Sequence, residues 1–103
     1  MKGFSPSFGS LDPRALLRAG RADDATRIYH QAAQANPRRP DAHNNLGVAL
    51  KAGGRFKEAI ESYRRAIKLD AAYATARNNL ARALRETGKH EEALAHFAIV
   101  SRT

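Results

Sequence analysis

The sequence contains no cysteine and no tryptophan. Without cysteine the chain can form no disulfide framework, no thiolate nucleophile and no cysteine-based zinc site. Its histidines do not form a paired metal-ligand motif either; they are His30, His43, His90 and His96. These absences point away from metal-dependent and thiol-dependent chemistry, and we expect neither a metal nor another cofactor.

Long apolar stretches are also missing. No segment approaches the roughly 20 consecutive apolar residues needed to span a bilayer. The first ten residues, MKGFSPSFGS, lack the continuous apolar region of a secretory signal. Their glycine, serine and proline residues predict a flexible N-terminal segment over residues 1–10. We expect a soluble, cytoplasmic protein with no membrane partner.

Acidic residues are scarce, with 10 against 18 lysines and arginines, so the formal net charge is +8. This charge favours an acidic partner, whether a peptide, a nucleic acid or an anionic lipid, and does not choose among them. Aromatic residues are few, three tyrosines and four phenylalanines, and most fall on packing positions. A base-stacking surface is therefore not indicated, and nucleic acid is the less favoured partner.

What the sequence does contain is an internal repeat. HNNLGVAL (residues 43–50) and RNNLARAL (residues 77–84) share the pattern NNL-x-x-AL at an offset of 34. A fixed period of this length over several classes of position is the signature of a repeat protein. The same offset aligns Gly20, Gly54 and Gly88; Ala25, Ala59 and Ala93; Tyr29, Tyr63 and Phe97; Ala32, Ala66 and Val100; and Leu16, Leu50 and Leu84.

Each unit has the apolar spacing of two helices. In the middle unit the i, i+3, i+4, i+7 spacing predicts a first helix of about Asp41 to Ala52 and a second helix to about Leu69. Gly53-Gly54 lies between them, and glycine reaches the left-handed conformation favoured at helix ends. Small residues on the buried faces allow the two helices to approach closely, while Tyr63 and its equivalent Phe97 fill the space between successive helix pairs.

This pattern resembles the tetratricopeptide repeat (TPR), and the residues that carry the resemblance are Leu46, Gly47, Leu50, Gly54, Ala59, Tyr63 and Ala66. The resemblance implies an all-α, right-handed α-solenoid of three helix-turn-helix units, about residues 11–39, 40–73 and 74–103. Asp12-Pro13 is a good helix start, which predicts a shortened leading helix of about Pro13 to Ala19. Ala71 replaces the proline that usually closes a unit, so we expect a less sharply fixed turn there.

No capping helix follows the third unit within these 103 residues. Terminal repeats usually need a polar outer face. We therefore expect either that the sequence is part of a longer array, or that Leu94, Phe97 and Val100 are covered by self-association in a homo-oligomer.

The first helices line the concave surface in the resembled family. A helical wheel places Asn45 away from the hairpin core, on a face shared with Val48, and its register equivalent is Asn79. Two such amides could hold the backbone of an extended peptide. This pair is similar to the asparagine ladder of O-GlcNAc transferases; the alternative is that both side chains are merely solvated. Asn44 is expected to bond neighbouring units.

Basic residues near this groove could attract an acidic segment; they are Arg14, Lys51, Arg82 and Arg85. The carboxylate clamp of heat-shock co-chaperones would fall on Ser10, Arg14, Asn45, Thr75 and Asn79. Only Asn45 has the residue type of the clamp, so we do not expect binding of a C-terminal carboxylate. His43 lies on an apolar stripe and is interpreted as a packed core residue. No nucleophile, base and orienting group occur together, so the chain is not expected to be an enzyme.

The sequence therefore predicts a protein-interaction module that binds an extended peptide or a partner helix in its groove. Two alternatives stay open. The chain could be the repeat segment of a larger enzyme such as a glycosyltransferase, or a basic helical surface that binds nucleic acid.

Overall fold

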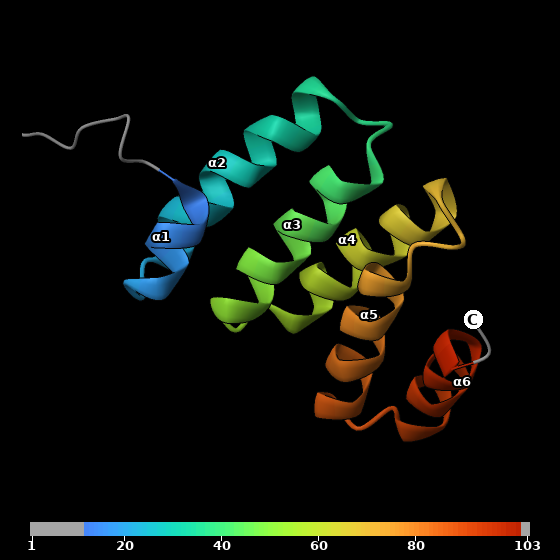
Figure 1. Cartoon of the computed structure of the whole chain (residues 1–103). Helices are drawn as coiled ribbons and strands as arrows, with labels where there is room; N and C mark the ends of the chain where they lie inside the picture. Colours follow the sequence, from blue (N-terminus) through green and yellow to red (C-terminus); the bar gives the residue numbers. More distant parts are fainter. Residues whose placement is uncertain (1–11, 102–103) are drawn as a thin grey trace, which may run out of the picture.

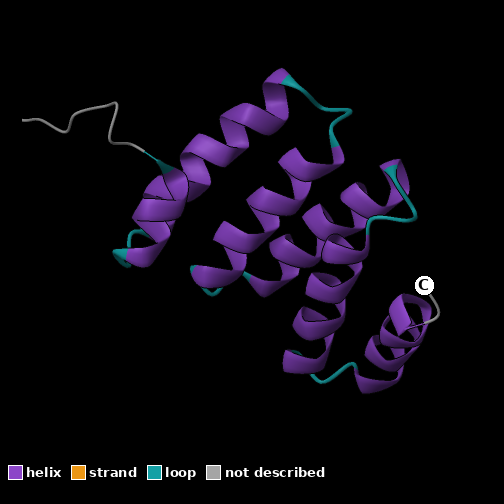
Figure 2. Cartoon of the chain, viewed as in Figure 1, coloured by secondary structure: helices purple, strands orange, loops and turns teal. Residues whose placement is uncertain are grey.

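Residues 12–101 are described by a computed structural model, and all their regular secondary structure is helical (Figure 2). No β-strand occurs in this part of the chain. The helices are α1 (Pro13–Arg18), α2 (Ala22–Ala35), α3 (Pro40–Ala52), α4 (Phe56–Leu69), α5 (Ala74–Glu86) and α6 (His90–Ser101). The predicted flexible segment, residues 1–10, lies outside the described residues.

The helices form three successive pairs, α1 with α2, α3 with α4 and α5 with α6 (Figure 1). Each helix packs against the next one along the chain, and α3 also contacts α5, so the leading helices of the second and third pairs meet in one layer. The described part is elongated, 52 × 27 × 20 Å. The prediction of an all-α array of three helix pairs is confirmed.

The first leading helix is short, as predicted, with six residues against 13 in α3. Asp12 caps it, because its Oδ1 accepts a hydrogen bond from the backbone N–H of Arg14 at 3.0 Å. Pro13 occupies the first turn, where the missing N–H costs nothing. The helix ends at Arg18, one residue before the expected Ala19.

The turns inside the three pairs share one backbone conformation. Gly20, Gly54 and Gly88 have φ angles of +79°, +82° and +88°, which residues with a Cβ rarely adopt. In each turn the following N–H reaches back to a carbonyl of the preceding helix; Arg55 N, for example, donates to Leu50 O at 2.8 Å. The recurrence of glycine every 34 residues is therefore explained by the positive φ angle that each of these turns requires.

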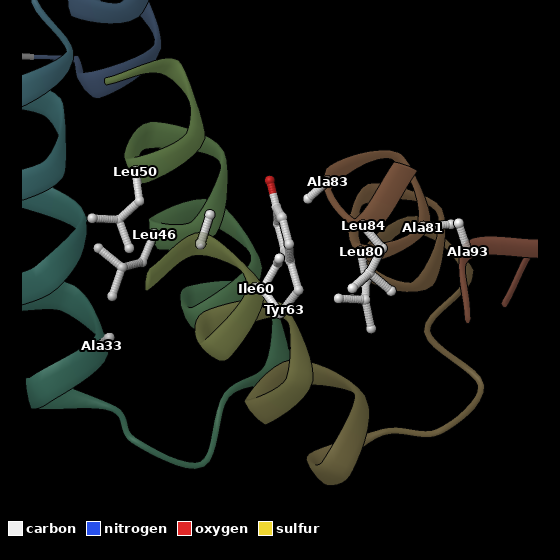
Figure 3. Packing of buried hydrophobic residues seen from close by; sticks show 11 residues of the cluster. Ala33, Leu46, Leu50, Ile60, Tyr63, Leu80, Ala81, Ala83, Leu84 and Ala93 are labelled. Atoms are coloured by element: carbon white, nitrogen blue, oxygen red, sulfur yellow. The ribbon is translucent and has the colours of Figure 1, made fainter. Parts of the chain in front are cut away.

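Tyr63 is the largest side chain in the core, and only 1% of it is exposed. Its ring lies between the α3–α4 pair and the residues Leu80, Ala83 and Leu84 of α5 (Figure 3). A Cβ atom at Gly47 would lie 2.5 Å from Tyr63 Cε1, far inside van der Waals contact. The absence of a side chain at Gly47 is thus what allows the ring to lie against α3.

The third pair repeats this packing less tightly. Ala81 stands where the second pair has Gly47, and Phe97 stands where it has Tyr63. Ala81 is fully buried, whereas Phe97 is only partly buried. The guanidinium of Arg85 lies over the Phe97 ring, 5.7 Å from its centroid, and covers part of it.

The loops between pairs are held by one recurring contact. The His43 Nε2 atom lies 2.7 Å from the carbonyl oxygen of Pro37. At the next junction Arg77, the register equivalent of His43, donates from Nη2 to the carbonyl of Ala71 at 2.9 Å. In both junctions a side chain of the new leading helix thus bonds the loop before it.

These contacts settle two expectations. His43 is a packed residue, as predicted, with 8% exposure; its Nδ1 has no hydrogen-bond partner among the described residues. The expectation of a loosely fixed turn at Ala71 is wrong. Besides the Arg77 contact, Asp70 Oδ1 accepts a hydrogen bond from Ala72 N at 3.1 Å, and together they replace the constraint of the missing proline.

Candidate peptide-binding surface

The candidate residues divide among three leading helices. Asn45, Val48 and Lys51 lie on α3, one helical turn apart in sequence, and Asn79, Arg82 and Arg85 lie on α5 with the same spacing. Arg14 lies on α1 and is largely exposed, and its charge partner is Asp12 at 3.9 Å. Because α3 and α5 are in contact, the first two groups are neighbours.

Asn44 and Asn79 join α3 to α5. Asn79 Nδ2 donates to Asn44 Oδ1 at 2.9 Å, and Arg82 Nη2 donates in turn to Asn79 Oδ1 at 2.8 Å. Only 4% of Asn44 is exposed, so this hydrogen bond satisfies a buried amide. Asn44 therefore bonds the neighbouring unit, as predicted. Asn79 also takes part, and it keeps one amide hydrogen and one oxygen lone pair for other contacts.

Asn45 differs from Asn79 in its surroundings. It is half-buried, and its amide makes no side-chain hydrogen bond to another described residue. Val48, one turn further along α3, is half-buried as well and packs against the edge of the core. The two side chains thus form a small surface with an open amide beside an apolar group.

The basic candidates are partly engaged within the protein. Lys51 Nζ of α3 lies 2.9 Å from Glu86 Oε1 of α5, which forms a second bridge between these helices. Arg85 lies over Phe97 of α6. The free positive charge of the groove is therefore smaller than the sequence suggests. Arg14 lies on α1, which packs chiefly against α2.

Two tyrosines border the same layer. Burial raises the pKa of Tyr63 to about 12, with smaller opposing effects from the charges of Arg82 and Glu86. Burial also raises the pKa of Tyr73, and the Asp41 carboxylate raises it further, against a hydrogen bond with Asn44 that lowers it. Both hydroxyls stay protonated at neutral pH, and that of Tyr73 is a polar, uncharged neighbour of Asn44.

A second polar network lies at the junction of α4, α5 and α6. Arg64 Nη2 of α4 lies 2.8 Å from Glu92 Oε2 of α6, and this hydrogen bond lowers the pKa of Glu92. Arg77 Nη1 lies 3.1 Å from His96 Nδ1. Burial and the Arg77 charge lower the pKa of His96, so the imidazole is neutral at pH 7 and can accept the hydrogen bond of Arg77.

One hollow of the described structure lies away from these residues. It measures about 780 Å³, and its lining residues come from α2, α3, α4 and the turn before α4. None of the predicted groove residues lines it. Sequence reasoning missed this hollow, although the small residue Ser62 at an otherwise bulky register position was an available signal.

Over residues 12–101 no group of three or more histidine, aspartate or glutamate side chains is placed to hold a metal ion. No helix among them is long and apolar enough to cross a membrane. The arrangement offers amides, guanidinium groups and shallow apolar surface, which are means of recognition.

Comparison with known proteins supports the resemblance to the tetratricopeptide repeat. The tetratricopeptide-repeat family matches residues 14–74 and 50–101. No curated protein matches the chain. Nothing in these comparisons supports the finer likeness to O-GlcNAc transferases that the wording of the repeats suggested.

Solved structures of MamA proteins superpose well. MamA from AMB-1 is 32% identical with a TM-score of 0.78, over 87% of this chain and 53% of that one. MamA from MSR-1 gives 32%, 0.78, 87% and 52%. MamA 41-end from Desulfovibrio magneticus RS-1 has a TM-score of 0.82 at 22% identity, over 87% and 51%, which is a likeness of fold alone. The chain spans about half the length of these MamA chains.

The period of 34, the three helix pairs, the glycines with positive φ and the family match agree with one another. The chain belongs to the tetratricopeptide-repeat family.

Proposed function

We propose that this chain is a non-enzymatic, cytoplasmic interaction module that binds an extended peptide of a partner protein along the leading helices α3 and α5. The observation that carries the proposal is the open amide of Asn45. It lies half-buried beside Val48 and makes no side-chain hydrogen bond to the rest of the described structure. An amide in this position can donate to and accept from a peptide backbone with little demand on sequence.

The neighbouring contacts support the same use. Because Asn44 and Asn79 bond each other, α3 and α5 hold a fixed spacing before a ligand arrives, which lowers the entropic cost of binding. Arg82 extends from this contact and is exposed. An acidic segment would gain long-range attraction from the net charge of +8, chiefly in its association rate.

Replacing Asn45 with alanine is expected to weaken peptide binding by about two- to tenfold, because one or two hydrogen bonds of about 0.5–1.5 kcal/mol are lost. The measurement is fluorescence anisotropy with an acidic peptide selected on a random peptide array. Asn78→Ala is the matched control, since Asn78 is half-buried on the flank of α5 and has no predicted role in the groove. Equal affinity of the Asn45→Ala variant and the wild type would contradict the proposal.

Asn79 is not suited to the same test. Its replacement by alanine removes the partner of the buried Asn44 and is expected to lower stability by about 1–3 kcal/mol.

A titration with single-stranded RNA over a salt series tests the alternative that the chain binds nucleic acid. Tight RNA binding with a steep salt dependence, together with no peptide binding, would favour a nucleic-acid-binding surface instead.

Self-association is a second candidate, favoured by exposed apolar side chains on α6. Leu94 is 66% exposed and Ile99 is 41% exposed, while the partly buried Phe97 and Val100 continue the same helix. We infer that a second copy covers these exposed side chains of α6, because large exposed apolar groups are typical of interfaces.

Sedimentation velocity over a range of concentrations tests this inference. The wild type is expected to form a dimer whose fraction rises with concentration, and Leu94→Glu is expected to shift it to monomer, since a carboxylate in an apolar contact is costly. Glu91→Lys on the exposed first turn of α6 is the control for a change of charge. A wild type that stays monomeric at every concentration would rule out the interface.

A further inference from the structure

The helix α6 has little apolar anchorage. It is the last helix of the described array and packs chiefly against α5 (Figure 1). Among its described residues only Ala93 is buried, whereas α4 and α5 contribute five buried residues each. Ala93 belongs to the same apolar cluster as Ala81 and Leu84 of α5 (Figure 3). Because so little apolar surface of α6 is buried, polar contacts carry a large share of its attachment.

Polar contacts join α6 to two earlier helices. The guanidinium of Arg64 in α4 lies 2.8 Å from Glu92, but both side chains are about four-tenths exposed, 44% and 40%, and such ion pairs contribute little to stability. The contact of Arg77 in α5 with His96 is better shielded. Nη1 of Arg77 lies 3.1 Å from Nδ1 of His96, and only 16% of the His96 side chain is exposed.

The contact between Arg77 and His96 requires a neutral imidazole. A guanidinium group can only donate hydrogen bonds, so Nδ1 of His96 accepts and the proton of the neutral ring lies on Nε2. In the imidazolium form both ring nitrogens carry a hydrogen, and the Nδ1–H group would point at the N–H group of Arg77. Protonation therefore replaces a hydrogen bond with two opposed donors, each of them on a cation.

Glu92 offsets this loss only in part. Its Oε2 atom lies 3.9 Å from His96 Nε2, beyond hydrogen-bonding distance, and the same oxygen is already bonded to Arg64. Charged groups act on the imidazole from three helices: Arg77 of α5 and Arg64 of α4 disfavour its cation, whereas Glu92 of α6 favours it. Burial and the Arg77 charge outweigh Glu92, so the pKa of His96 is lowered.

The first and second helix pairs carry other residue types at this position. By the period of 34, Ile28 and Ser62 are the equivalents of His96. Neither isoleucine nor serine changes its charge between pH 5 and 8, whereas histidine does. A change of pH in this range therefore acts at this position in the third pair alone.

We propose that His96 makes the attachment of α6 sensitive to pH: the neutral ring accepts the Arg77 hydrogen bond and holds α6 against α5, and the protonated ring releases that contact. In the unfolded chain the imidazole has an ordinary pKa of about 6.5. The pKa in the folded chain is lower, so the contribution of His96 to stability is fully present above the unfolded pKa. It is lost as the pH falls through the folded pKa.

The neighbouring ion pair stays intact over the same range. The hydrogen bond from Arg64 holds the pKa of Glu92 below its usual value, so this carboxylate is still ionised when the imidazole takes up its proton. The loss of attachment on acidification is thus a property of His96. Opening of α6 uncovers part of the apolar side of α5, where Ala81 and Leu84 are now fully buried.

Amide hydrogen exchange of the full chain, measured by NMR at pH 7.5 and pH 5.5, tests the proposal. Protection factors correct each rate for the exchange of an unstructured chain at the same pH. They are expected to fall at least about twofold in α6 at the lower pH and to change little in α4, which contains no histidine. Unchanged protection of α6, or an equal fall in α4, would overturn the proposal.

The variant His96→Asn isolates the role of the imidazole. The asparagine amide oxygen can accept from Arg77 near the place of Nδ1, but it does not titrate. The protection of α6 is therefore expected to be the same at both pH values. The matched control is His90→Asn, the same substitution at an exposed position on the same helix, which is expected to keep the fall in protection. A pH response that persists in His96→Asn, or disappears in His90→Asn, would contradict the assignment.

The side-chain NMR signal of His96 gives a measurement that does not depend on the folding of His96→Asn. In the wild type it is expected to titrate at a lower pH than in the chain unfolded by urea. Arg77→Gln removes the cation and is expected to move this titration to higher pH. Arg82→Gln removes a cation elsewhere on α5, one that bonds Asn79, and should leave it unchanged. Titration of His96 at the same pH in the folded and unfolded chains would rule the proposal out.

Discussion

Replacing Tyr63 with alanine is expected to lower the free energy of unfolding by about 3–5 kcal/mol, the usual cost of deleting a large buried aromatic side chain. The ring is 1% exposed and touches both the second and the third helix pair, so its loss leaves a cavity at their junction (Figure 3). For a small domain this is a large share of a total of about 5–15 kcal/mol. Urea unfolding followed by circular dichroism measures the change.

Phe97→Ala is the matched control, because Phe97 holds the equivalent place in the third pair and is only partly buried. It is expected to cost clearly less than Tyr63→Ala. Tyr63→Phe keeps the ring and separates its packing from its hydroxyl. Equal losses at positions 63 and 97 would show that the two junctions are packed alike, contrary to the structure.

Replacing Gly47 with alanine is expected to destabilise the protein by about 1–3 kcal/mol, the usual cost of overpacking. In an open helix the same change would stabilise by about 1 kcal/mol, because alanine is the better helix former. Here the new methyl group would lie 2.5 Å from Tyr63 Cε1, and that ring is enclosed by α5 and cannot move aside freely. Steric conflict therefore outweighs helix propensity. Thermal and urea unfolding of the variant give the sign directly.

The reciprocal change, Ala81→Gly, is the natural control for Gly47→Ala. Ala81 is fully buried and its methyl group is accommodated by a partly exposed Phe97, so glycine there should be destabilising through lost packing and higher backbone entropy. Combining Gly47→Ala with Tyr63→Ala should cost less than the sum of both changes, since the second removes the ring that the first one meets. A stabilised Gly47→Ala variant would show that the ring relaxes.

The sequence was sufficient to predict the fold because its strongest signals are local and periodic. Glycine at a fixed offset, apolar stripes and the Asp12-Pro13 start each determine a turn or a helix boundary within a few residues. The Ala71 turn was misjudged because its substitute constraint comes from Arg77, a side chain six residues away. Such a contact depends on the direction in which α5 extends from the loop, and the sequence pattern does not reveal that direction.

The site was less predictable because it depends on how two helices face one another. The period pairs Asn45 with Asn79 as equivalent positions, yet the observed hydrogen bond joins Asn44 to Asn79, one residue out of register. Equivalent residues occupy the same face of successive helices, whereas contacting residues face each other, and the crossing of α3 and α5 decides which they are. The hollow needed the same kind of information, because the residues that line it come from α2, α3 and α4.

The contact that α3 and α5 each make with the loop before them bears on how repeat proteins grow by duplication of a unit. Its acceptor is a backbone carbonyl, at Pro37 in one case and Ala71 in the other, and any residue can provide that group. Its donor, His43 or Arg77, travels with the unit that needs to be oriented. A duplicated unit therefore carries the side chain that orients it against the preceding loop. The sequence of that loop can change without loss of the contact, because every residue has a backbone carbonyl.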